Sequence, residues 1–223
     1  MSAGNSAQAR ADATLKASQP TGLWARTRAY FGFGSKPSAE AVEEASKWEA
    51  GAEGERRTAD LVRTLHPESW SGLFDRHIPG LHSANVDIAL ISPSGEVITI
   101  DAKLWHRNAV VCAVNGELHH GEKKYPRVIS SVLFETSQIE KSLHDALARR
   151  GATRPVKVTP LIVMHNAPVS GDGFTVEGVQ VVPAERLLSV LRKMAGTPDL
   201  EWAAYVAGVL EQLLPRYVEG GRR

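Results

Sequence analysis

The chain has 223 residues, 43% of them hydrophobic, and a formal net charge of +1 at pH 7. A chain of this length can build one good-sized hydrophobic core with extensions, and the near-neutral charge excludes a bulk polycation. Any contact with nucleic acid must therefore come from a local basic patch.

The single cysteine, Cys112, excludes an internal disulfide framework and is typical of a reducing compartment. It lies in the apolar run 110–114, where we interpret it as a buried, inert thiol. No run reaches the roughly 18–20 apolar residues of a membrane span, and the first residues lack the apolar core of a signal peptide. We therefore expect a cytoplasmic protein.

Residues 1–36 are predicted to form an N-terminal arm, either disordered or loosely docked on the rest of the chain. Residues 1–20 are rich in Ala, Ser and Gln without a sustained apolar period, which predicts disorder or a frayed helix. An aromatic and basic patch follows at 22–33. This patch could contact a membrane surface, nucleic acid or a protein partner, or it could dock onto the domain.

A helix is predicted from residue 35 to residue 65, with a break at Gly51 and Gly54 as an option. Glu55 falls on the core-facing stripe of this helix, which also holds Trp48, Ala52, Ala59 and Val62. A glutamate that faces a core is costly unless it binds a metal or pairs with, for example, a buried arginine. Each glycine lowers helix stability by about 1 kcal/mol relative to alanine. Glycines at these positions are understandable if the backbone approaches a strand or a substrate phosphate there.

Strands are predicted at 72–78, 85–91 and 97–105. Pro93-Ser94-Gly95 suits a three-residue hairpin loop with glycine in the left-handed conformation. In that register Val86, Ile88 and Leu90 share one face, and Asp87 lies directly across from Asp101. Like charges placed opposite each other destabilise a sheet, so either Lys103 or a bound divalent cation must compensate.

The rest of the chain continues the alternation of strands and helices. Asn115-Gly116 predicts a second hairpin from 109–114 and 117–120. The remaining predicted elements are a helix at 128–150, strands at 156–165 and 179–182, and helices at 183–194 and 199–218. This order predicts one α/β domain with a mixed central β-sheet flanked by helices over 37–195, followed by a C-terminal helix and tail over 196–223.

Asp87, Asp101 and Lys103 together suggest metal-dependent phosphodiester chemistry. Mg²⁺ takes hard oxygen ligands and keeps several waters, so two or three carboxylates suffice, and the carbonyl of Ala102 could add a ligand. Lys103 would orient the attacking water or offset the charge that develops on the phosphate. The alternative is a surface hairpin whose charged side chains are merely solvated.

Four motifs in this order resemble the NERD (nuclease-related domain) family of the PD-(D/E)xK restriction-endonuclease-like superfamily, over roughly residues 48–194. They are Gly51-x-x-Gly54-Glu55-Arg56, Asn85-Val86-Asp87, Val97-x-x-Ile100-Asp101-Ala102-Lys103-x-Trp105 and Asn115-Gly116-x-Leu118-x-x-Gly121. The resemblance implies a restriction-endonuclease-like αβββαβ core and an ancestry in Mg²⁺-dependent DNA cleavage. It also implies that Glu55 is the helix carboxylate, Asp87 the main metal ligand, Asp101 the second ligand and Lys103 the catalytic lysine.

Further polar residues lie near the predicted site. Gln138, on the helix after the hairpins, resembles a polar residue at the edge of sites in this superfamily, and a solvated helix face explains it equally well. Lys123, Lys124 and Arg127 form the most basic stretch, with His119, His120 and Tyr125 nearby, and are predicted to contact phosphates. A solvated loop is the alternative reading.

The sequence therefore predicts a metal-dependent nuclease that hydrolyses DNA with Mg²⁺ or Mn²⁺. Glu55, Asp87 and Asp101 would be its metal ligands, Lys103 and Gln138 would take part in catalysis, and DNA would be its partner. Two alternatives stay open. One is a non-catalytic nucleic-acid-binding or interaction module that keeps the fold. The other is an interaction or membrane-peripheral protein led by residues 22–33.

Overall fold

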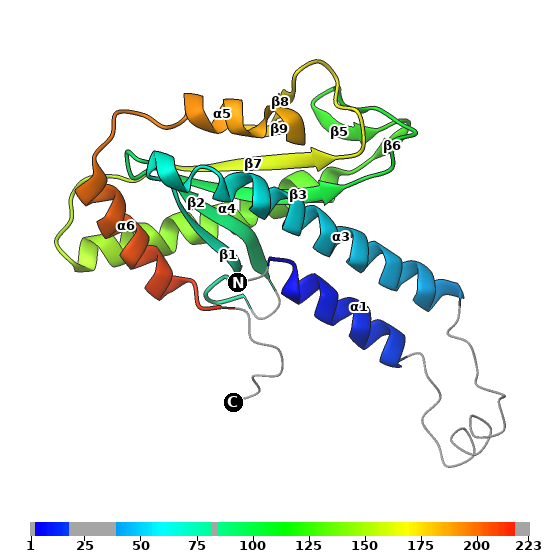
Figure 1. Cartoon of the computed structure of the whole chain (residues 1–223), viewed down its shortest axis with the longest axis horizontal. Coiled ribbons are helices and arrows are strands. Elements are labelled where there is room, and N and C mark those ends of the chain that lie inside the picture. Colours follow the sequence, from blue (N-terminus) through cyan, green and yellow to red (C-terminus); the bar gives the residue numbers. More distant parts are fainter. Residues whose placement is uncertain (1–2, 18–38, 82–83, 217–223) are drawn as a thin grey trace, which may run out of the picture.

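The computed structural model describes residues 3–17, 39–81 and 84–216 (Figure 1). The aromatic and basic patch 22–33 lies outside these ranges, so its predicted contacts stay predictions. Within the described ranges, no helix is both long enough and apolar enough to cross a membrane.

A six-stranded mixed sheet, with strand order β1-β2-β3-β7-β9-β8, forms the centre of the molecule. The antiparallel part comprises β1 (Ser71–His77), β2 (Asn85–Ile91) and β3 (Val97–Leu104). Beyond β3, β7 (Val158–His165) and β9 (Val179–Pro183) run parallel to it, and β8 (Phe174–Val176) closes the edge antiparallel to β9. The strands β7 and β9 were predicted, whereas β8 was not.

Helices cover both faces of the sheet (Figure 1). The helix α3 (Ala39–Arg63) and the helix α5 (Leu187–Lys193) pack on one face, and α4 (Pro126–Arg149) and α6 (Leu200–Leu213) on the other. Two short 3₁₀ helices adjoin two of these helices: η1 (His66–Glu68) follows α3, and η2 (Ala184–Arg186) precedes α5. The elements α3, β1, β2, β3, α4 and β7 follow the predicted αβββαβ order.

A small second sheet lies beside the carboxyl end of β3. It consists of β4 (Val111–Val114), β5 (Glu117–His120) and β6 (Lys123–Lys124). The predicted Asn115-Gly116 turn joins β4 to β5, and both turn residues have positive φ angles, as a type I′ turn requires. The strand β6 was not predicted.

The N-terminal helix α1 (Asn5–Ala17) packs along α3 (Figure 1). Ala3, Ala7 and Ala11 are buried at this contact, where small side chains let the two backbones approach closely. The weak apolar period of this segment had predicted disorder or a frayed helix. Alanines bury little surface each, so the sequence pattern understates how well the helix packs.

The predicted hairpin register of β2 and β3 is confirmed at four residue pairs, from Ile91–Val97 to Ile88–Ile100. Gly95 has a φ angle of +85°, as the predicted loop needs. The pairing stops one position before Asp87 and Asp101, so these two residues are not a ladder pair. Val86 is also an exception, because it packs in the core beneath α4 and α6, whereas Ile88 packs on the α3 side.

Candidate active site

The helix α3 lies close to β3 because Gly54 has no side chain at the contact. A Cβ atom at Gly54 would lie 3.4 Å from both the backbone nitrogen and the Cβ atom of Leu104. The helix is continuous through both glycines, so the optional break at Gly51 and Gly54 does not occur. The close approach that was predicted for a glycine is confirmed, and it brings the next residue, Glu55, over the end of the sheet.

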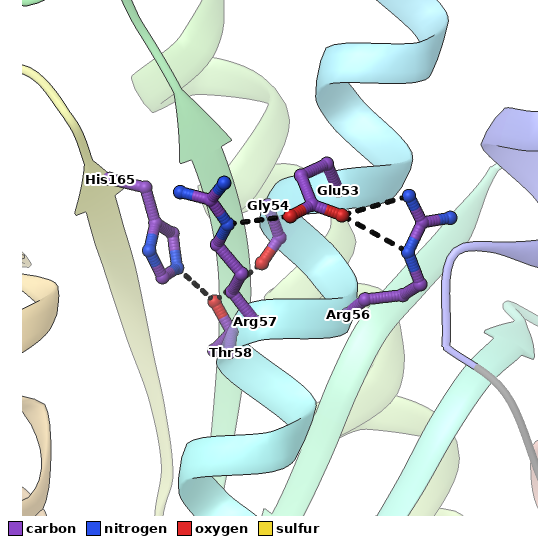
Figure 2. A network of polar contacts seen from close by, with 6 residues as sticks. All are labelled: Glu53, Gly54, Arg56, Arg57, Thr58 and His165. Carbon is purple, nitrogen blue, oxygen red and sulfur yellow. Dashed lines mark hydrogen bonds and ion pairs between the residues drawn. The ribbon is translucent and has the colours of Figure 1, made fainter.

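A hydrogen bond ties the same turn of α3 to β7 (Figure 2). The Thr58 hydroxyl donates to the Gly54 carbonyl oxygen at 2.9 Å and lies 2.7 Å from Nε2 of His165. Because a hydroxyl has one proton to donate, His165 Nε2 must carry the proton of the second hydrogen bond. Burial lowers the pKa of His165, and the nearby Arg57 guanidinium lowers it further, so the ring stays neutral.

The outer side of α3 carries an ion-pair network that does not enter the site. Glu53 accepts hydrogen bonds from Arg56 at 2.9 Å and from Arg57 at 2.7 Å (Figure 2). These bonds lower the pKa of Glu53, and its side chain is partly solvated. Glu53 and Glu55 are therefore two glutamates of one helix turn in opposite electrostatic environments.

Two carboxylates and a lysine from β2 and β3 lie beneath Glu55. Asp87 Oδ2 accepts a hydrogen bond from the Ala102 backbone N–H at 2.9 Å. The ammonium group of Lys103 donates to Asp101 Oδ1 at 2.7 Å. Lys103 thus compensates the Asp101 charge, one of the two predicted ways to relieve the repulsion between the aspartates.

A further carboxylate, Glu135 on α4, joins this group from the other side of the sheet end. It falls three residues after Val132 and four before Ile139, both of which are buried. The same stripe argument that pointed to Glu55 would therefore have found Glu135. Gln138, which was predicted instead, is half-buried one turn further along α4 and does not line the cavity described below.

Asp75 on β1 is also close to the site. It is buried, has a φ angle of +49°, and accepts a hydrogen bond from the Asn85 side chain at 3.2 Å. Its charge is among the causes that perturb Glu55. Asp75 lies within β1, in the strand predicted at 72–78, and was not identified as a site residue from the sequence.

Crowding of carboxylates in a partly buried site shifts their pKa values upward. Burial, followed by repulsion from Asp87 and Asp75, raises the pKa of Glu55 to about 9. Burial and the charge of Asp101 raise the pKa of Asp87 to about 7, and the same two causes raise the pKa of Glu135 to about 7. At neutral pH the site therefore holds protons that isolated carboxyl groups would release.

In Lys103, nearby charges outweigh the effect of burial on the pKa. Burial alone would lower its pKa, but the charges of Asp101 and Asp87 and the hydrogen bond to Asp101 outweigh burial, so its pKa is raised. The ammonium group therefore stays protonated at neutral pH.

One cavity of about 960 Å³ lies at the carboxyl end of β3, and it is lined by Glu55, Asp87, Asp101, Lys103 and Glu135, whereas Asp75 lies outside its lining. Its walls include residues of α1, α3, the sheet end, the β5–β6 region and α4. Of the predicted site residues, the structure brings together Glu55, Asp87, Asp101, Lys103 and Lys123. Lys124 and Arg127 lie outside this cavity, with Lys124 paired to Glu117 at 2.6 Å.

The donor chemistry of this cavity fits a divalent cation. Glu55 Oε2 and Asp101 Oδ2 are buried without a hydrogen-bond partner, and carboxylate oxygens are the ligands that Mg²⁺ and Mn²⁺ prefer. Within the part of the chain that the structure describes, no three His, Cys, Asp or Glu side chains are already placed to hold an ion. A cation here would therefore take some of its ligands from water or phosphate, as Mg²⁺ commonly does.

A comparison with protein-family models identifies residues 50–165 as a nuclease-related domain, NERD. The chain belongs to the NERD family. The matched segment runs from α3 to the last residue of β7, and it includes all four carboxylates and the lysine of the cavity. The family is placed in the restriction-endonuclease-like superfamily, and the mixed sheet flanked by helices confirms the predicted fold class.

Neither the curated proteins nor the solved structures contain a match to this chain.

Proposed function

We propose that this NERD protein hydrolyses phosphodiester bonds in DNA with the help of Mg²⁺ or Mn²⁺. The observation that carries the proposal is the convergence of Glu55, Asp87, Asp101 and Glu135 around Lys103 in one cavity. Such a density of like charge is costly for a fold to maintain, and perturbed pKa values of this kind cluster at functional sites. A cytoplasmic location stays a prediction from the sequence.

Asp87 and Asp101 would hold the cation, with Glu55 as a further ligand. When bound, a divalent cation supplies a Lewis acid for the phosphate and lowers the pKa of a coordinated water. Because the pKa of Asp87 is raised to about 7, cation binding requires that a proton leave its carboxyl group near neutral pH.

Lys103 is the residue of this chain that would stabilise developing charge. Its ammonium group stays protonated, is half-buried, and lies beside Asp101 at 2.7 Å. A positive charge that the protein partly shields from solvent stabilises a phosphate transition state more strongly than it would in bulk water. Glu135, with a pKa of about 7, is placed to accept or hold a proton next to this pair.

The test combines metal binding with cleavage. Calorimetric titration of Mg²⁺ and of Mn²⁺ should give binding heat for the wild type and lose it in the double variant Asp87→Asn/Asp101→Asn. Cleavage of labelled DNA should be lost in Asp87→Ala and in Lys103→Ala. Glu53→Gln, a change on the outer side of the same helix, is the matched control and should keep both activities. Cleavage unchanged in Asp87→Ala and Lys103→Ala would contradict the proposal.

A non-catalytic nucleic-acid-binding module is the second candidate. It is favoured by the direct Asp101–Lys103 ion pair, together with the lack of three placed metal ligands among the described residues. In that case the protein would bind DNA without metal-dependent turnover, and Asp87→Asn would leave its affinity unchanged or improve it, since a negative charge is removed.

A further inference from the structure

Three aromatic rings, those of Trp105, His120 and Tyr125, form a cluster that lines the cavity. The ring centroids of Trp105 and Tyr125 are 4.4 Å apart, and those of Trp105 and His120 are 5.1 Å apart at an interplanar angle of 29°. All three residues line the cavity and none is fully buried. Part of each side chain is therefore available to a ligand in the cavity.

This cluster is held next to the carboxylates by the chain itself. Trp105 follows β3 directly and lies two residues after Lys103, and its backbone N–H donates to the His165 carbonyl oxygen at 3.3 Å. A ligand whose phosphate reached Lys103 would therefore place its neighbouring groups against the Trp105 ring.

A fourth ring lines the cavity from α3. Trp48 lies on the same stripe of the helix as Glu55, about 10 Å away along the helix axis at 1.5 Å per residue. The guanidinium carbon of Arg10, on α1, lies 5.0 Å from the Trp48 ring centroid. Aromatic side chains from α3 and from the segment after β3 thus both line the cavity.

Positive charges accompany the rings. Lys123 and Arg107 line the same cavity, and Lys123 Nζ lies 5.1 Å from the Tyr125 ring centroid. Rings on which bases stack, interleaved with cations that contact phosphates, are the arrangement by which proteins bind single strands without reading their sequence. In a duplex the faces of the bases are covered by their neighbours and cannot stack on protein rings.

We propose that the cavity binds a single-stranded segment of DNA, with bases stacked on Trp105 and Trp48 and a phosphate directed at Lys103. The inference rests on the proposed function and narrows its substrate class to unpaired DNA. The size of the cavity agrees with this occupant, because about 960 Å³ is at the upper end of the roughly 300–1,000 Å³ that encloses a drug-sized ligand.

Binding is tested on the full chain, in EDTA to prevent cleavage and at one fixed salt concentration. Fluorescence anisotropy is measured with a labelled single strand of about 12 nucleotides, a length within the range of known single-strand sites. The duplex of the same sequence and the matching RNA strand are measured in parallel. We expect the dissociation constant of the single DNA strand to be lower than that of the duplex by roughly tenfold or more.

Single-strand affinity should fall roughly 5- to 150-fold in Trp105→Ala and in Trp48→Ala, the range expected for the loss of one stacked base. Trp105→Phe, which keeps an aromatic face, should retain most of the affinity. Phe134→Ala removes a ring that is 52% exposed on α4 outside the cavity and should change nothing. Because Trp105→Ala removes the centre of a ring cluster, Trp48→Ala provides an independent test should the first variant not fold.

The outcomes separate this inference from the proposed function. Duplex binding as tight as single-strand binding, or affinity that is unchanged in both folded tryptophan variants, overturns the inference. Tighter binding of the RNA strand overturns the choice of DNA. Single-strand binding that depends on Trp105 but never leads to cleavage supports the inference and contradicts the nuclease proposal. Equal cleavage of duplex and single-stranded DNA supports the nuclease proposal and contradicts the inference.

Discussion

Replacing Glu55 by glutamine should stabilise the protein at alkaline pH when no metal is present. Native Glu55 keeps its proton up to about pH 9, whereas the unfolded chain releases it near the ordinary value of 4.5. Between these two values the native state binds more protons than the unfolded state, so the stability of the wild type falls as pH rises. Glutamine has no such proton to lose.

The size of this effect follows from the difference between the two pKa values. One pH unit corresponds to about 1.4 kcal/mol, so at pH 8, roughly 3.5 units above the unfolded value, the upper limit is about 5 kcal/mol. Asp87 and Asp75 share the repulsion, and buried sites respond as if their dielectric constant were about 20. We therefore expect Glu55→Gln to gain about 2–3 kcal/mol at pH 8 and less than about 1 kcal/mol at pH 5.

The assay is urea unfolding in EDTA at several pH values from 5 to 8, analysed by linear extrapolation. Glu53→Gln is the matched control. Because the pKa of Glu53 is lowered and its side chain is partly solvated, its removal should leave the pH dependence of stability as in the wild type. Parallel pH profiles for the wild type and Glu55→Gln would refute the claim that Glu55 is held in its protonated form.

Three further predictions concern the surroundings of the site. Thr58→Val removes the acceptor of the buried His165 Nε2–H and should lower the free energy of unfolding in urea by about 1–3 kcal/mol. A variant as stable as the wild type would show that this hydrogen bond contributes nothing. Mg²⁺ or Mn²⁺ at about 100 times its dissociation constant should add about 2.7 kcal/mol of stability to the wild type, and Asp101→Asn should lose most of this gain; equal stabilisation of both proteins would exclude Asp101 as a ligand. Gly95→Ala forces a side chain into the left-handed conformation and against the Trp202 ring, so it should lower stability by about 2–4 kcal/mol without changing metal binding; a smaller cost would indicate that the loop relaxes.

Most of the site that the sequence predicted does come together in the structure. Glu55 was identified because a carboxylate on the apolar stripe of a helix needs a partner, and the structure buries it to 7% exposure beside Asp87. The same rule applied to the later helix would have found Glu135, whereas Gln138 was chosen from family resemblance and lies outside the cavity. The stripe argument was thus the more reliable guide to side-chain placement.

The basic residues show where sequence reasoning ends. Lys123 and Lys124 are neighbours in sequence, yet Lys123 lines the cavity and Lys124 pairs with Glu117 on the small second sheet. Adjacent residues on a strand point to opposite faces. The sequence shows this alternation but not which face of β6 is turned toward the cavity.

By itself, the sequence determined the features that depend on neighbouring residues. Strand periodicity and turn chemistry settled the register of β2 and β3, the left-handed Gly95 and the Asn115-Gly116 turn, because these depend on steric effects within a few residues. Only the tertiary structure decided that α1 packs on α3, that Glu135 faces Asp101 and that rings from three separate segments line one cavity. Those contacts join residues far apart in the chain, and their geometry is set by how whole helices and sheets pack rather than by any local pattern.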